Sequence, residues 1–203
     1  LPGGLQGTPV ALKTWGELSR NRMIVLLLSI TAAQTSGQFT VFTFMAPLLK
    51  KLTNASPDAI GLVFALFGIA GFVGILIATR IVDTWGAYRT SLLFNALVAA
   101  GIAGWALGAG FYVAMAVAVT VWGLGFAATN SMQQVRLVAA ALPLASASVS
   151  LNTSVLYIGQ AIGSFVGGLF YERAYLHGVG FVAVAFVAVA LMLVVASRPH
   201  ARS

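Results

Sequence analysis

The chain has 203 residues, of which 60% are hydrophobic and only 7% are charged, and its mean hydropathy is +0.97. A soluble domain could not bury so large an apolar fraction, so the composition excludes that class and indicates an integral helical membrane protein. The net charge of +7 comes from scattered cations between apolar stretches rather than from a basic stripe with stacking aromatics, which argues against nucleic-acid binding. The chain has no cysteine, which excludes disulfides and thiol chemistry.

Taken in chain order, residues 1–22 are Gly/Pro-rich and then polar, and are expected to be a cytoplasmic linker. Six apolar segments follow within 23–197, and each is long enough to cross a hydrocarbon core of about 30 Å. They are expected at 23–49, 58–79, 91–108, 111–134, 144–171 and 177–197. Loops are expected at 50–57, 80–90, 108–110, 135–143 and 172–176, with a polar cytoplasmic tail at 198–203. The predicted fold class is all-α, integral to the membrane, with six transmembrane helices.

Positive charges predict the orientation, because Lys and Arg accumulate in short cytoplasmic loops. One side of the predicted membrane region holds only Lys50, Lys51 and Arg173. The other side holds Lys13, Arg20, Arg22, Arg80, Arg89, Arg136, Arg198 and Arg202. We therefore expect both ends of this segment and the 80–90 loop in the cytoplasm. Arg136 is expected at the membrane interface, where anchoring, topology and function explain it equally well.

Polar residues at membrane depth indicate helices that line something other than lipid. In the first segment, Gln34 and Gln38 lie one turn apart on the same face as Phe42. This face has two interpretations. It can line a cavity for a neutral polar ligand with an apolar part, or its amides can bond across a helix–helix contact.

The fourth and fifth segments carry further polar faces, whereas the third and sixth are almost purely apolar and are expected to face lipid. Asn130 lies on a polar face of the fourth segment, deep enough to meet a ligand. The fifth segment carries a polar stripe formed by Ser146, Ser150, Thr153, Tyr157, Gln160 and Ser164. About a quarter turn from that stripe, a GxxxGxxxG pattern predicts a face on which two helix backbones approach closely. Its members are Gly159, Gly163 and Gly167.

Several chemistries are not supported by the residues. The four acids fall in loops or at helix ends, so no carboxylate suited to proton relay lies at mid-membrane. The sequence also lacks a phosphate-binding glycine loop, a metal-spaced histidine cluster and a buried Ser/His pair. We therefore expect no enzyme activity, no cofactor and no metal.

Three stretches carry a family resemblance. GQFTVFTFMAPLL (37–49) is similar to the seventh helix, and the stretch 122–172 to the tenth and eleventh helices, of major facilitator superfamily transporters. RIVDTWGAYR (80–89) resembles the second-half copy of that superfamily's loop motif. The chain thus resembles the C-terminal six-helix half of such a transporter, closest to the drug:proton antiporter and arabinose-efflux-permease-like branch.

The loop motif is matched only in part. Arg80, Asp83, Gly86 and Arg89 fit it, whereas Thr79 stands where a glycine is usual. The resemblance implies a reduced cytoplasmic gate in which Asp83 acts on a helix N-terminus of the opposite half. The alternative to a gate is that the charged residues of this loop only determine the membrane topology.

The resemblance implies half of a twelve-helix fold, built from two inverted three-helix repeats, in a bacterial inner membrane. The implied function is secondary active transport by alternating access, as proton-coupled efflux of a sugar, nucleoside or drug. The implied partners are the lipid bilayer, a small-molecule substrate, protons, and an N-terminal six-helix half that supplies the coupling acid. The residues expected to face substrate are Gln34, Gln38, Asn130, Tyr157 and Gln160.

Two other interpretations stay open. One is a stand-alone six-helix protein that homodimerises, through the face of Gly159, Gly163 and Gly167 or a neighbouring face. The other is a non-transporting membrane module, such as an assembly or sensor partner, in which the polar faces only join helices.

Overall fold

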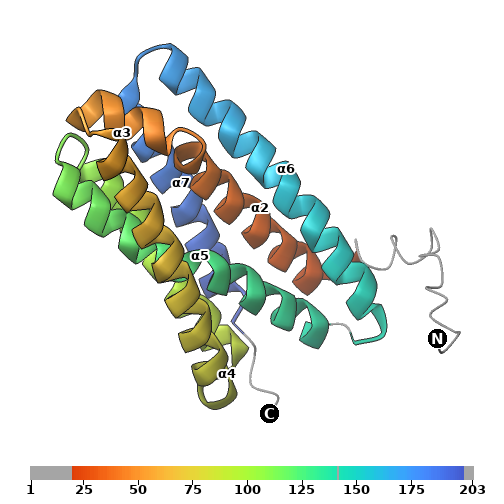
Figure 1. The fold of residues 1–203 in the computed structure, drawn as a ribbon. Helices are drawn as coiled ribbons and strands as arrows, with labels where there is room; N and C mark the ends of the chain where they lie inside the picture. The colour runs from red at the N-terminus through yellow and green to blue at the C-terminus, as the bar shows by residue number, and fades with distance from the viewer. Residues whose placement is uncertain (1–19, 141, 199–203) are drawn as a thin grey trace, which may run out of the picture.

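The structure, a computed structural model, describes residues 20–140 and 142–198, and these form a helical bundle (Figure 1). Five helices in this part of the chain are long and apolar enough to cross a membrane, which confirms the all-α membrane fold. In chain order the elements are α2 (Arg22–Phe42), α3 (Met45–Thr53), α4 (Pro57–Leu107), α5 (Tyr112–Ala140), the short 3₁₀ helix η1 (Leu142–Leu144), α6 (Ala145–Glu172) and α7 (Leu176–Ala196). Most of the predicted linker 1–22 and of the tail 198–203 lies outside the described residues.

α4 supplies two of the six expected crossings, because its chain reverses direction at Gly86. Gly86 has φ 77° and ψ 156°, a conformation that is essentially restricted to glycine. The two arms, 57–85 and 87–107, run back along each other (Figure 1) and share a buried cluster around Ala78 and Phe94. The expected loop over 80–90 is therefore wrong in extent. The charged residues there remain helical, and only Gly86 allows the reversal.

The first predicted segment, 23–49, forms two helices rather than one. Pro47 has no backbone N–H, and its ring excludes a regular helix at the carbonyl of Thr43, so the chain breaks between α2 and α3. α3 then continues through both lysines to Thr53, and the capping residue Asn54 adopts a left-handed φ of 53°. The expected loop 50–57 is reduced to 54–56 for this reason.

α5 is also longer than predicted. The loop expected at 135–143 is helical as far as Ala140, since the sequence VRLVAA contains neither glycine nor proline. Arg136 therefore belongs to a regular helix and not to a loop.

The helices pack in a reciprocal pattern. The first three-helix set consists of α2 and the two arms of α4, and the second consists of α5, α6 and α7. α2 packs against α6 and α7 of the second set, whereas α5 packs against both arms of α4 in the first. The backbones of α4 and α5 approach closely at two glycines of α4. A Cβ added at Gly74 would lie 1.9 Å from the Leu124 carbonyl oxygen, and one added at Gly101 would lie 2.4 Å from the Trp122 nitrogen. Each three-helix set is thus completed by the first helix of the other.

The apolar core is divided along the bundle. One cluster surrounds Trp105 and Trp122 and extends to the α3 end. A second cluster, with Ile24, Leu137 and Val194, lies at the other end, where α2 begins and where α5 and α7 end. The polar residues of α2 lie between these two clusters, at mid-bundle.

Candidate functional site

Buried amides join α2 to α5 at mid-bundle. The Gln34 Nε2 donates a hydrogen bond to the Thr129 Oγ1, and the Gln38 Oε1 accepts one from the Trp122 Nε1 at 2.8 Å. Gln34 and Gln38 are only 4% and 2% exposed. The partners occur in opposite order along the two helices, so α2 and α5 are antiparallel. In this conformation Gln34 and Gln38, two of the predicted substrate-facing residues, are both bonded to another helix.

An asparagine pair extends this polar layer to α6. The Asn152 Oδ1 accepts a hydrogen bond of 2.6 Å from the Thr31 hydroxyl, and the Asn152 Nδ2 donates to the Asn130 Oδ1 at 3.4 Å. Asn152 is fully buried, whereas the predicted residue Asn130 is only partly buried. Asn152 was not among the residues predicted from the sequence. Its position seven residues before Gly159, on the same helical face, is the signal that could have found it.

The polar stripe of α6 is open. Tyr157 is 64% exposed and Gln160 is partly buried. Only 17% of the residues in the most apolar stretch of Leu142–Glu172 are buried. Near the α3 end, the hydroxyls of Thr43 and Ser164 lie 2.8 Å apart and connect the end of α2 to this stripe. Polar groups are costly against lipid, so the stripe requires an aqueous cavity or a protein partner.

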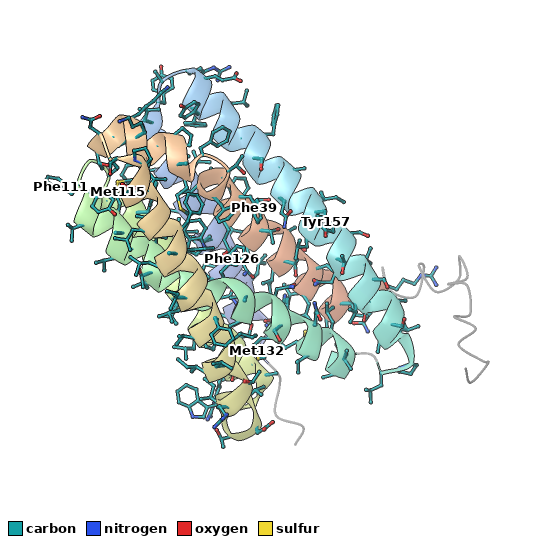
Figure 2. All side chains as sticks on the ribbon, in the orientation of Figure 1. Phe39, Phe111, Met115, Phe126, Met132 and Tyr157 are labelled. Carbon is teal, nitrogen blue, oxygen red and sulfur yellow. The ribbon has the colours of Figure 1, made fainter. Side chains whose placement is uncertain are left out.

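A cluster of aromatic rings borders the polar layer. The rings of Phe42 and Phe126 are stacked with centroids 5.8 Å apart, and Phe39 lies 6.4 Å from Phe126. Figure 2 shows Phe39 and Phe126 near the middle of the bundle and Tyr157 on α6. Because all three phenylalanines are only partly buried, they offer ring surface on which a flat molecule could stack. The sequence prediction missed Phe126, although it lies four residues from Asn130 on the same helix.

The predicted gating residues gather around the α4 reversal. Arg80, Asp83 and Arg89 are all exposed, and Gly86 forms the turn between them. The Thr90 hydroxyl donates a hydrogen bond of 3.0 Å to the Gly86 carbonyl, which closes the start of the second arm. The charges are therefore presented at one end of the bundle, on a turn that α4 itself holds.

The three glycines of the GxxxGxxxG pattern are buried against α2. A Cβ on Gly159, Gly163 or Gly167 would lie 2.0–2.4 Å from an atom of α2. The face considered for a homodimer is thus already covered within the chain, and a homodimer would need another surface.

The five predicted substrate-facing residues therefore fall into two groups. Gln34 and Gln38 are enclosed between helices, while Asn130, Tyr157 and Gln160 keep exposed surface. Across residues 20–140 and 142–198, no group of three or more His, Asp or Glu side chains could hold a metal ion. Asn130, Tyr157 and Gln160 offer hydrogen bonds from amide and phenol groups, and none of the three carries a charge.

Comparison with known proteins gives one family and several relatives. The sequence profile of the Major Facilitator Superfamily matches residues 27–203. The chain is 26% identical over 194 residues to the "Uncharacterized MFS-type transporter YbcL" of Bacillus subtilis (strain 168), covering 94% of this chain and 50% of that protein. It is 30% identical over 135 residues to the "Purine ribonucleoside efflux pump NepI" of Salmonella paratyphi C, covering 66% of this chain and 33% of that pump.

A third relative has a different kind of name. The chain is 29% identical over 169 residues to the "Transcription regulatory protein OpdE" of Pseudomonas aeruginosa, covering 79% of this chain and 38% of that protein. The chain spans about half the length, or less, of these curated relatives.

Proposed function

Because this chain belongs to the Major Facilitator Superfamily, we propose that it forms one six-helix half of a twelve-helix secondary transporter. The share of YbcL that the chain covers, 50%, supports this assignment. The stretches 37–49, 80–89 and 122–172 favour the C-terminal half, with an N-terminal six-helix half as its partner.

The observation that carries the proposal is the open polar stripe of α6. Tyr157 is 64% exposed on a helix that is apolar enough to span a membrane. A second six-helix half facing this stripe would enclose a polar cavity near the middle of the membrane, where transporters of this architecture hold substrate. Asn130, Tyr157 and Gln160 are the substrate-facing residues that the geometry favours. Gln34 and Gln38 would join them only after α2 and α5 separate.

The proposed activity is export of a small neutral molecule, such as a sugar, nucleoside or drug, in exchange for protons by alternating access. The name of the Salmonella relative, a purine ribonucleoside efflux pump, supports both export and the nucleoside class. The partly buried rings of Phe39 and Phe126 would stack on a base, and Asn130 would hydrogen-bond to its edge. Protonation would occur in the other half, because Asp58 and Glu172 lie at helix ends and Asp83 beside the α4 turn.

The proposed location is a bacterial inner membrane, with the Gly86 end of the bundle in the cytoplasm. Arg22, Arg80, Arg89 and Arg198 gather at that end, as the positive-inside rule requires of cytoplasmic segments. Asp83, exposed beside the turn, would act as a reduced gate against a helix N-terminus of the partner half.

Labelling at single cysteines tests the proposal, since the chain has no native cysteine. In the intact protein, made cysteine-free elsewhere, Tyr157→Cys and Gln160→Cys should react with a membrane-impermeant maleimide in vesicles. Inosine, arabinose and chloramphenicol serve as neutral substrate probes, and at least one should slow the reaction. Ile69→Cys, 63% exposed on the apolar first arm of α4, is the control that should stay unlabelled. If no solute in a broad panel of neutral compounds slows the labelling, this result would count against a substrate cavity.

A second candidate, a non-transporting sensor or assembly module, has one specific observation in its favour. The Pseudomonas relative carries the name of a transcription regulatory protein. The bonding of Gln34 and Gln38 between helices also fits this alternative. Proteoliposomes with an imposed pH gradient separate the two, because a module of this kind would move none of the probes.

The mass of the native polypeptide in its membrane distinguishes the twelve-helix transporter from a stand-alone six-helix homodimer. A product of about twice the 21.1 kDa of this chain supports the twelve-helix transporter, whereas a product of 21.1 kDa supports the homodimer.

A further inference from the structure

We propose that a pocket at the Gly86 end of the bundle binds the anionic phosphate headgroup of a membrane lipid. The pocket has a volume of about 610 Å³ and lies where α2 begins, α4 reverses, and α5 and α7 end. Its lining combines two cations, Arg89 and Arg136, with an aromatic ring, Tyr88, and the apolar side chains of Met23 and Leu27. None of its lining residues belongs to the polar stripe of α6, so the proposal goes beyond transport and does not depend on it.

Arg136 is the central residue of this pocket. The sequence led us to expect it at the membrane interface, yet its side chain is only 8% exposed. Its Nη1 donates to the Ser91 Oγ at 3.3 Å, and its Nη2 donates to both the carbonyl oxygen and the hydroxyl of Ser197. Its Cζ lies 5.5 Å from the centroid of the Tyr88 ring. All of these partners are neutral, so they solvate the guanidinium without balancing its charge.

A buried cation without a counter-charge is energetically costly. Guanidinium carries five N–H donors and stays protonated in proteins. The protein bonds that the structure gives to Arg136 engage three of them, so two remain for an anion. Arg89 adds a second, exposed cation, and no acidic side chain is among the described lining residues. Phosphate oxygens match such a pair of arginines well.

The surroundings of the two arginines favour a lipid over a soluble anion. Met23, Leu27, Ala139 and Ala140 give the pocket apolar walls along which an acyl chain can lie. Trp85 on the rim is 51% exposed, as expected of a tryptophan at the level of lipid headgroups. Basic pockets between transmembrane helices are a recognised arrangement for lipid headgroups. The same phosphate chemistry is found in free phosphate, and the experiment below separates the two sources.

Arg136 also joins three helix ends at this pocket. Tyr88 and Ser91 belong to the second arm of α4, Arg136 to α5, and Ser197 follows α7. A headgroup bound to Arg136 would therefore stabilise the relative positions of these ends. Bound lipid should raise the melting temperature of the protein.

The test uses the intact protein, stripped of lipid in a neutral detergent. Dioleoylphosphatidylglycerol, dioleoylphosphatidylcholine or inorganic phosphate is added, and bound lipid is measured by native mass spectrometry and stability by thermal unfolding. We expect phosphatidylglycerol to be retained and to raise the melting temperature, and phosphatidylcholine and free phosphate to do neither. Stabilisation by free phosphate equal to that by phosphatidylglycerol would overturn the lipid assignment.

Three variants test the site itself. Arg136→Gln and Arg89→Gln should each lower phosphatidylglycerol affinity about tenfold, as expected for the loss of a charged hydrogen bond. Arg173→Gln removes the same charge from the turn between α6 and α7 and should leave the affinity unchanged. Because Arg136 also ties helix ends, Ala139→Phe provides an independent test that narrows the pocket and keeps both arginines. Affinity equal to that of the parent protein in Arg89→Gln and Ala139→Phe would overturn the site.

Discussion

Gln38 of α2 and Trp122 of α5 form a buried polar pair in the middle of the bundle. The indole Nε1 donates to the Gln38 Oε1 at 2.8 Å, and the two side chains are 2% and 0% exposed. The same indole packs edge-on against Phe42 and Phe67, with ring centroids 6.2 and 5.1 Å away. Gln38 therefore satisfies the one polar atom of a ring that is otherwise in apolar contact.

Removing the amide should destabilise the fold rather than only alter transport. Gln38→Leu leaves the Trp122 N–H buried without an acceptor, which should cost about 1–3 kcal/mol of unfolding free energy. Trp122→Phe should cost more, since it also removes ring contacts. The double variant should be more stable than the sum of the single losses predicts, by about 1 kcal/mol. Denaturant unfolding in detergent measures all three, and strictly additive losses would mean that the two groups are not coupled.

The contact between α6 and α2 should depend on Gly163. A Cβ at this position would lie 2.1 Å from the Ser36 carbonyl oxygen, so Gly163→Ala must push the two helices apart. We expect a loss of about 1–3 kcal/mol in thermal unfolding, as for other overpacked sites. Gly61→Ala is the matched control, because nothing lies within 4 Å of its added Cβ, and it should be neutral or slightly stabilising. Equal stability of the two variants would show that α6 does not pack on α2 as described.

The reversal of α4 should require glycine at position 86. Its φ of 77° and ψ of 156° lie where a Cβ is strained, although the added methyl group would meet no neighbour within 4 Å. Gly86→Ala should therefore cost about 1–3 kcal/mol through backbone strain alone. Gly68→Ala, in a helical part of the first arm with open space around it, separates this strain from a general effect of replacing glycine. A neutral Gly86→Ala would mean that the turn is wider than one residue.

Tyr157 should matter for transport and not for stability. It is 64% exposed, so Tyr157→Ala should change the melting temperature little. If it faces substrate, as proposed, kcat/KM for a transported probe should fall about tenfold or more. Tyr175→Ala removes an equally exposed tyrosine between α6 and α7 and should leave transport unchanged. Parallel losses in both variants would argue for a surface effect.

Hydropathy identified the membrane segments but not their ends. At 80–90 and 135–140 the charged residues lower the hydropathy, yet they remain helical, because long cationic side chains can reach water from a helix. The break between α2 and α3 was readable from the chemistry of Pro47, whereas hydropathy continues across it.

The partners of the polar faces could not be predicted from one helix alone. Helical spacing placed Gln34 and Gln38 on one face correctly, but Thr129 and Trp122 approach them from a helix some ninety residues later in the chain. The same applies to Asn130, whose partner Asn152 lies on α6. A side chain that lines a cavity and one that bonds to another helix have the same pattern in sequence. Only the packing of α5 and α6 distinguishes them.

The reciprocal packing also bears on how the nascent chain assembles. α2 leaves the ribosome before the other described helices, but the helices it packs against most extensively, α6 and α7, are the last of the described helices to be synthesised. Until α5 and α6 arrive, its Thr31, Gln34 and Gln38 lack the partners they have in the finished bundle. The α4 hairpin, in contrast, can insert as a pair and receive α5 next. Helix insertion and helix assembly are therefore separated in time. α2 should be held near the translocon until the last two helices are released.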